Sequence, residues 1–79
     1  NIKYPTISQE TGSQGKVIVQ FVVDRDGTIS NPEVVRGVDP YLDKEAIRVI
    51  SSMPKWTPGV QNGKKVRVKY TVPVSFRLQ

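Results

Sequence analysis

The residues best suited to recognition chemistry are the basic side chains near the end of the chain. Residues 61–79 contain five Lys and Arg and no acid, whereas residues 1–60 contain seven residues of each sign. This segment therefore carries the whole net charge of +5, which suits an acidic partner. From Lys64 to Leu78 apolar and polar residues alternate, as in a half-buried antiparallel strand. The face expected in the core reads Val66, Val68, Tyr70, Val72, Val74, Phe76, Leu78, and the face expected in water reads Lys65, Arg67, Lys69, Thr71, Pro73, Ser75, Arg77.

Pro73 indicates where this strand lies in its sheet. Proline has no N–H to donate to a ladder, so it is confined to edge strands, strand starts or bulges. Even-numbered residues should therefore pair with an interior strand, while the water-facing residues leave their backbone groups at a free edge. The candidate binding residues on that edge are Lys65, Arg67, Lys69 and Thr71. Two interpretations stay open, because edge lysines can protect against aggregation and an open edge can also accept a partner's extended segment.

A second pattern, from Val22 to Glu33, resembles a calcium-binding loop. Asp24, Asp26 and Gly27 fall at EF-hand positions three, five and six, and Glu33 falls at position twelve. Val22 stands at position one, where an oxygen ligand is required, and the preceding residues predict a strand rather than a helix. We therefore interpret the segment as a hairpin turn and expect no metal site.

The composition argues against catalysis and against nucleic-acid binding. The chain has no Cys and no His, which excludes disulfides, thiolate or imidazole metal ligands and His-dependent nucleophiles. Tyr70 and Phe76 could stack on bases, but they alternate with the cations and so face the other way. The acids Asp43 and Glu45 are expected on a solvated helix face. We expect no catalytic residue, no cofactor and no nucleic-acid partner.

The remaining segments predict the elements that hold this edge in place. Strands at residues 16–24 and 28–36 should form a hairpin through the Asp-Gly turn, because such a pair between β-branched runs favours one. Pro32 places the second strand at an edge, or marks a bulge at Asn31-Pro32. A short helix is expected from Tyr4-Pro5 to about Thr11.

The main helix should begin with Asp39 as its N-cap and Pro40 at the first helical position, and Pro54 should end it. Its apolar stripe is predicted to be Leu42, Ala46, Val49, Ile50 and Met53.

Together these elements predict an α+β fold in two layers. A three-stranded antiparallel sheet in strand order 2-1-3 is covered on one face by the main helix and the short N-terminal helix. Residues 1–79 should form one domain, with Trp56 packed where the helix meets the sheet. No apolar run is long enough to cross a membrane, and a chain that begins with Asn1 rather than Met is expected to be a piece of a longer protein.

An ordered set of motifs resembles the family of TonB C-terminal domains over nearly all of the chain. The motifs are Tyr4-Pro5, Gly15-Lys16-Val17, Phe21-Val22-Val23-Asp24-x-Asp26-Gly27, Leu42-Asp43-x-Glu45-Ala46, Met53-Pro54-x-Trp56-x-Pro58-Gly59, Gly63 and Val72-Pro73-Val74-x-Phe76. Each motif is weak alone, but their order is specific. One departure is Ser8, where the family usually has Ala in the first helix.

The resemblance implies a periplasmic domain, anchored to the inner membrane in the full-length protein and powered by a proton-driven motor through the part that precedes Asn1. The partner it implies is the TonB box of an outer-membrane transporter, which pairs with the last strand. Siderophores, cobalamin or glycans would cross through that transporter. The resemblance also leaves room for a weak or strand-swapped homodimer.

A second function class remains open, since similar domains end other envelope proteins. The same domain could be a recognition module on a membrane-bound sensor or peptidase that drives no transport. The upstream sequence would discriminate the two classes, because a single helix followed by a Pro-rich linker is typical of the transducer.

Overall fold

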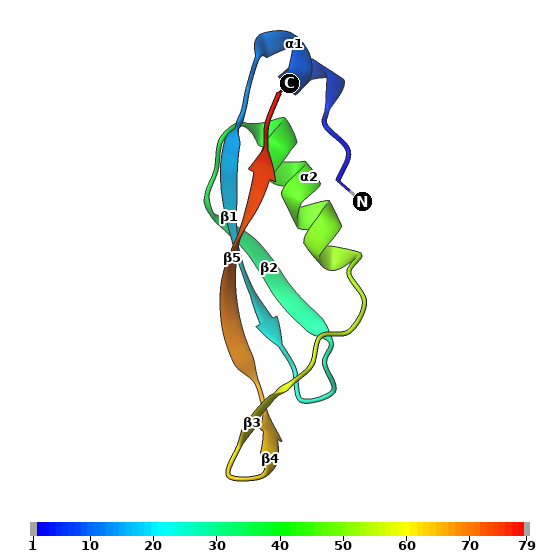
Figure 1. The fold of residues 1–79 in the computed structure, drawn as a ribbon, viewed down its shortest axis with the longest axis vertical. Coiled ribbons are helices and arrows are strands. Elements are labelled where there is room, and N and C mark those ends of the chain that lie inside the picture. The colour runs from blue at the N-terminus through cyan, green and yellow to red at the C-terminus, as the bar shows by residue number, and fades with distance from the viewer. Residues whose placement is uncertain (1, 79) are drawn as a thin grey trace.

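The order of elements along the chain already shows one main helix between two groups of strands. The computed structural model describes residues 2–78, and its elements are α1 (Thr6–Thr11), β1 (Gly15–Val23), β2 (Ile29–Arg36), α2 (Pro40–Ser51), β3 (Gly59–Gln61), β4 (Lys64–Val66) and β5 (Val68–Phe76). The main sheet has three antiparallel strands in the order β2-β1-β5. Because β5 is the third strand of the predicted sheet, the predicted order 2-1-3 is confirmed. Figure 1 shows α2 against one face of this sheet and the β3–β4 hairpin at the end opposite α1.

The central strand β1 pairs differently with its two neighbours. Its register with β5 runs without interruption from Gly15↔Phe76 to Val23↔Val68. Its register with β2 shifts twice, and one shift lies opposite Asn31 and Pro32, where Asn31 has a φ of 50°. Both interpretations of Pro32 are therefore confirmed, because β2 is an edge strand and is also bulged.

The core forms between alternate residues of β1 and one stripe of α2. Its buried hydrophobic residues are Val17, Val19, Phe21, Val23, Leu42, Ala46, Ile50, Val74 and Phe76. β1 lies between β2 and β5, and α2 packs on its inward face, so the inward side chains of β1 are fully buried. In the predicted helical stripe Val49 is only half-buried. The prediction that Met53 belongs to the helix is wrong, because α2 ends at Ser51, before Pro54, and the half-buried Met53 lies beyond it.

Local signals set the start of α2 and the turn that precedes β2. The Asp39 carboxylate accepts a hydrogen bond from the Leu42 N–H at 2.7 Å, and Pro40 is the first helical residue, as predicted. In the β1–β2 turn the Gly27 N–H donates to the Asp24 carbonyl at 2.9 Å. Gly27 has a φ of 87°, a conformation that favours glycine.

Two predictions about the last strand are wrong. The predicted strand from Lys64 to Leu78 is broken at Arg67 into β4 and β5, and Leu78 is exposed rather than in the core. The β3–β4 hairpin was also not predicted, although Asn62-Gly63 is a strong signal for it. Both turn residues have positive φ, 53° and 75°, as a two-residue type I′ turn requires.

Trp56 lies in the segment that follows α2 and packs against the main sheet. Its ring meets Phe21 edge-on at a centroid distance of 5.1 Å and lies 5.3 Å from Tyr70. It is partly buried against the core, so the prediction that Trp56 packs on the sheet is confirmed; its aromatic contacts are with residues of β1 and β5.

Candidate partner-binding edge

The four predicted binding residues are spread along the β4–β5 segment, on both sides of the break between the two strands and at the break itself. Lys65 belongs to β4, Lys69 and Thr71 belong to β5, and Arg67 lies at the junction of the two strands. All four are exposed. In β5 the even-numbered residues contact the core, so Lys69 and Thr71 point to the sheet face that α2 does not cover. Their cross-strand neighbours on β1 are Val22 and Gln20.

One cation of this edge forms an ion pair with an acid in the turn between β1 and β2. The Arg67 Nε lies 2.7 Å from Asp24 Oδ1, with 53% of the Arg67 side chain and 31% of the Asp24 side chain exposed. Asp24 directly follows Val23, whose partner is Val68, so the ion pair continues the β1–β5 ladder by one step. The sequence alone does not predict this pair, because Asp24 and Arg67 are far apart in the chain and no local pattern links them.

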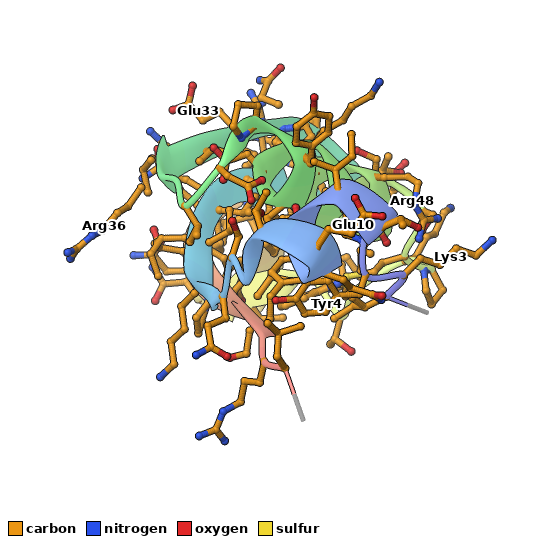
Figure 2. The ribbon with its side chains drawn as sticks, turned by 90° about the horizontal axis from the view of Figure 1, so that it is seen from above. Lys3, Tyr4, Glu10, Glu33, Arg36 and Arg48 are labelled. Atoms are coloured by element: carbon orange, nitrogen blue, oxygen red, sulfur yellow. The ribbon has the colours of Figure 1, made fainter. Side chains whose placement is uncertain are left out.

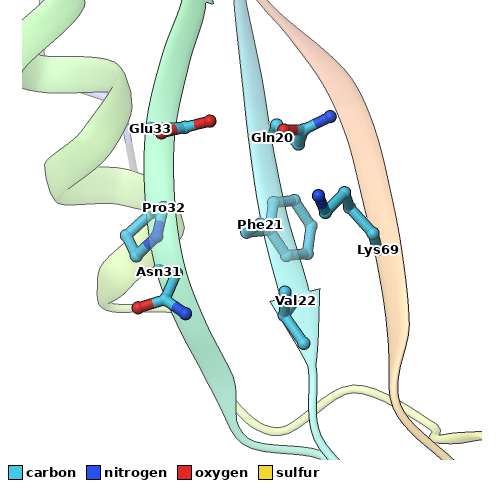
Figure 3. A pocket seen from close by; sticks show the side chains of 7 residues that line it. All are labelled: Gln20, Phe21, Val22, Asn31, Pro32, Glu33 and Lys69. Carbon is cyan, nitrogen blue, oxygen red and sulfur yellow. The ribbon is translucent and has the colours of Figure 1, made fainter.

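The bulge in β2 leaves a hollow on the uncovered face of the sheet. Figure 3 shows that it is lined from all three strands: Gln20, Phe21, Val22, Asn31, Pro32, Glu33 and Lys69. Its volume is about 530 Å³ and it is open to solvent. Lys69 and Glu33 are the charged groups at its rim, so the hollow is polar and shallow rather than a pocket for an apolar ligand.

A carboxylate on α2 makes the densest polar contacts in the described part of the chain. Glu45 accepts hydrogen bonds from Arg48 Nε and Nη2, both at 2.7 Å, and its Oε2 also accepts the Lys3 backbone N–H at 2.7 Å. The prediction that Glu45 lies on a solvated face is wrong, since only 9% of the residue is exposed. The side chains of Lys3 and Arg48 extend from the same flank of the molecule (Figure 2).

The charge of Glu45 is stabilised by these contacts. The Arg48 hydrogen bonds lower the pKa of Glu45 to about 2, and the Lys3 N–H adds to the effect against the opposing influence of desolvation. Glu45 therefore remains ionised at neutral pH and fastens the N-terminal segment to α2.

Other contacts attach the same segment to the fold. The Ser8 side chain is fully buried, and its hydroxyl donates to Asp39 Oδ2 at 3.0 Å. The Tyr4 hydroxyl donates to the Ser13 carbonyl, and the Tyr4 ring meets Phe76 edge-on at 5.7 Å. Ser8 thus uses its hydroxyl, which an Ala at this position would lack.

The acids of the proposed hairpin turn are engaged within the protein. Asp24 pairs with Arg67, and Asp26 Oδ1 accepts the Thr28 N–H at 2.9 Å, a bond that lowers the pKa of Asp26. Within residues 2–78 no group of three or more acids is close enough to hold a metal ion. Over the same residues, no helix has both the length and the apolar character needed to span a membrane.

Comparison with known proteins gives the family. A model of the Gram-negative bacterial TonB protein C-terminal family matches residues 1–78. The chain belongs to the TonB C-terminal family. Protein TonB of Pseudomonas aeruginosa is 31% identical over 96% of this chain, which spans 22% of that relative's length.

Solved structures agree with the fold. An NMR structure of the Helicobacter pylori TonB C-terminal domain covers 99% of this chain and 70% of its own, with a TM-score of 0.75 and 24% identity. A second NMR structure, of a shorter form of that domain, covers 94% of this chain and 77% of its own, with a TM-score of 0.69 and 25% identity. These TonB C-terminal domains therefore share the α+β arrangement described above.

Proposed function

We propose that this TonB C-terminal domain is the non-enzymatic, partner-binding end of an energy transducer. It binds the TonB box of an outer-membrane transporter by strand addition along the residues Lys65, Arg67, Lys69 and Thr71. The full-length protein is anchored to the inner membrane, places this domain in the periplasm and takes energy from a proton-driven motor. The transported nutrient, such as a siderophore, cobalamin or a glycan, does not contact the domain.

The observation that carries the proposal is the open edge of β5. Ile18 faces Pro73 across the β1–β5 ladder, and this cannot be a hydrogen-bonded pair because Pro73 has no N–H. Hydrogen-bonded and non-bonded pairs alternate in an antiparallel ladder, so Thr71 and Lys69 also direct their backbone groups away from β1. Those groups are available to a partner strand.

The β3–β4 hairpin supports a continuation of the same edge. Gln61 and Lys64 flank the two-residue turn, where the flanking residues exchange hydrogen bonds. The next pair, Val60↔Lys65, is then of the non-bonded type, so Lys65 also directs its backbone groups away from β3. An incoming strand could therefore run from Lys65 to Thr71 along one side.

The other open edge, on β2, is less suited to strand addition. β2 has two register shifts, whereas β5 pairs with β1 without a shift. Bulges twist an edge and interrupt its row of donors and acceptors, a common protection against pairing with another chain. The regular edge on β5 is consequently the better template.

The test is titration of the domain with a synthetic TonB-box peptide from a transporter, followed by amide shifts in NMR spectra. We expect micromolar affinity or weaker, because a short peptide loses backbone entropy when it becomes ordered. The largest shifts should lie between Lys65 and Thr71. Shifts confined to β2 would show that the other edge binds, and absence of binding would leave the edge lysines as protection against aggregation.

A matched pair of variants separates backbone pairing from charge. Lys69→Pro removes one edge N–H at a position whose backbone groups, like those of Pro73, point away from β1. Lys69→Ala removes the side chain but keeps the N–H. Strand addition predicts at least about a tenfold loss for Lys69→Pro, since a carbonyl on the peptide loses its donor and the ring blocks close approach. The loss for Lys69→Ala should be smaller. Equal affinities for the two variants would contradict strand addition.

A further inference from the structure

The proposed edge is built from two strands that belong to different sheets. β5 is held by nine consecutive residue pairs with β1, from Gly15↔Phe76 to Val23↔Val68. β4 pairs with β3 through the three pairs Gly59↔Val66, Val60↔Lys65 and Gln61↔Lys64. The break between the strands falls at Arg67. A partner strand that spans both needs β4 to lie in line with β5.

The β3–β4 hairpin has little in its own packing to fix that alignment. No residue in either of its strands is buried, and 67% of Val60 is exposed at its surface. The hairpin extends beyond the end of the main sheet, away from α2 (Figure 1). An isolated two-stranded hairpin is marginally stable in water. Its orientation must therefore depend on contacts where it joins the rest of the fold.

The segment that leads into the hairpin is attached to the turn between β1 and β2, and the first residue of the hairpin lies against β5. The Trp56 N–H donates to the Gly27 carbonyl at 2.9 Å, while its ring packs on Phe21 and Tyr70. The approach is so close that a Cβ on Gly27 would lie 2.3 Å from the Trp56 carbonyl oxygen. A few residues later Gly59 lies against Val68, because a Cβ there would be 2.4 Å from Val68 Cγ2.

The end of the hairpin is held by the same turn. Asp24, at the first position of the turn, forms an ion pair with Arg67 at 2.7 Å. Arg67 directly follows Val66, the last residue of β4. Asp24 keeps its place through its backbone, since its N–H donates to the Thr28 carbonyl at 2.8 Å and its carbonyl accepts the Gly27 N–H at 2.9 Å. The carboxylate is thus presented from a hydrogen-bonded turn to a residue at the break between β4 and β5.

We propose that Asp24 is a positioning residue for partner binding. Through Arg67 it holds β4 in line with β5, so that the edge from Lys65 to Thr71 is continuous and can accept a long extended segment. Arg67 contributes to the edge mainly by this pairing, and Lys65 and Lys69 are the cations that meet an acidic partner. This inference rests on the proposed function, but the alignment of the hairpin is a property of the free domain.

The first test therefore needs no partner. Asp24→Asn removes the charge and retains the backbone bonds of the turn, and Glu33→Gln removes an equal charge from an exposed residue of β2. Hydrogen exchange of the hairpin amides at Gly59, Gln61, Lys64 and Val66 should be about 2- to 5-fold faster in Asp24→Asn, the range expected for an exposed ion pair. Exchange in Glu33→Gln should match the wild type. Unchanged exchange in Asp24→Asn would overturn the inference.

The second test uses peptide length. A long TonB-box peptide can reach from Thr71 to Lys65, whereas a short one ends before Arg67 and contacts β5 alone. In the wild type the long peptide should bind more tightly, and in Asp24→Asn that gain should fall by about 2- to 5-fold while the short peptide is unaffected. Asp24→Glu, which keeps a carboxylate, should restore part of the gain.

The outcomes distinguish the two proposals. If neither peptide binds the wild type, strand addition is wrong and the exchange experiment still decides the role of Asp24. If both peptides bind and lose affinity equally in Asp24→Asn, the residue acts on the whole domain rather than on the alignment of β4. If the gain with length is unchanged, Asp24 has no positioning role.

Discussion

Replacement of Glu45 by Gln should remove most of the attachment between the N-terminal segment and α2. Gln has the same shape and can still accept one hydrogen bond, but it cannot hold the charge that Arg48 and the Lys3 N–H stabilise. The variant therefore isolates the electrostatic part of the contact. Glu10→Gln, at an exposed acid of α1, is the matched control.

The size of the effect follows from the pKa of Glu45. Its decrease from 4.5 to about 2 corresponds to at most about 3 kcal/mol of folding free energy. The Arg48 side chain is 48% exposed, so solvent screens the pair and reduces that limit. We expect Glu45→Gln to lower the free energy of unfolding by about 1–2 kcal/mol at pH 7, and Glu10→Gln by less than about 0.5 kcal/mol.

The pH dependence has a definite sign. Because folding lowers the pKa of Glu45, its contribution is fully present above about pH 5 and disappears as the pH falls from 4.5 towards 2. Denaturant unfolding of wild type and Glu45→Gln at several pH values and constant ionic strength should therefore converge near pH 2. In NMR titrations of the folded wild type, the Lys3 amide shift should follow the protonation of Glu45 and change near pH 2. A stability difference that is equal at pH 7 and pH 2 would refute the electrostatic explanation.

Three further predictions concern other parts of the fold. Trp56→Ala should lower the free energy of unfolding by about 3 kcal/mol, because it removes the ring packed on the core; a melting temperature close to that of the wild type would show that the ring contributes little. Millimolar calcium should leave the melting temperature unchanged, since Asp24 and Asp26 are engaged by Arg67 and by the Thr28 N–H; a saturable rise that Asp26→Ala abolishes would contradict the turn assignment. The double variant Lys65→Glu/Lys69→Glu should slow association with an acidic peptide and make the association rate less dependent on salt. Stopped-flow measurements at several ionic strengths test this, and an unchanged rate would exclude electrostatic attraction.

Local sequence signals were enough to predict the main sheet, the start of α2 and the edge position of β5, but they placed the end of α2 too late, at Pro54 instead of Ser51. Alternation from Lys64 onward separates the two faces of β5, the Asp-Gly turn joins β1 to β2, and Asp39-Pro40 starts α2. Each of these signals is local, because side-chain period, turn conformation and capping depend on residues that are neighbours in the chain. Asn62-Gly63 is the same kind of local signal for the β3–β4 hairpin. The uninterrupted alternation of apolar and polar residues from Lys64 onward suggested a single long strand instead and concealed that signal.

The contacts between polar side chains depend on the folded path of the chain. Glu45 is buried because the segment at Lys3, 42 positions earlier in the chain, lies across α2, and no periodic pattern within the helix indicates that. Asp24 and Arg67 likewise meet only because β1 and β5 pair in one register. Ion pairs and side-chain hydrogen bonds between distant residues depend on the path of the chain through space, so the sequence supplies the groups and the packed fold determines their partners.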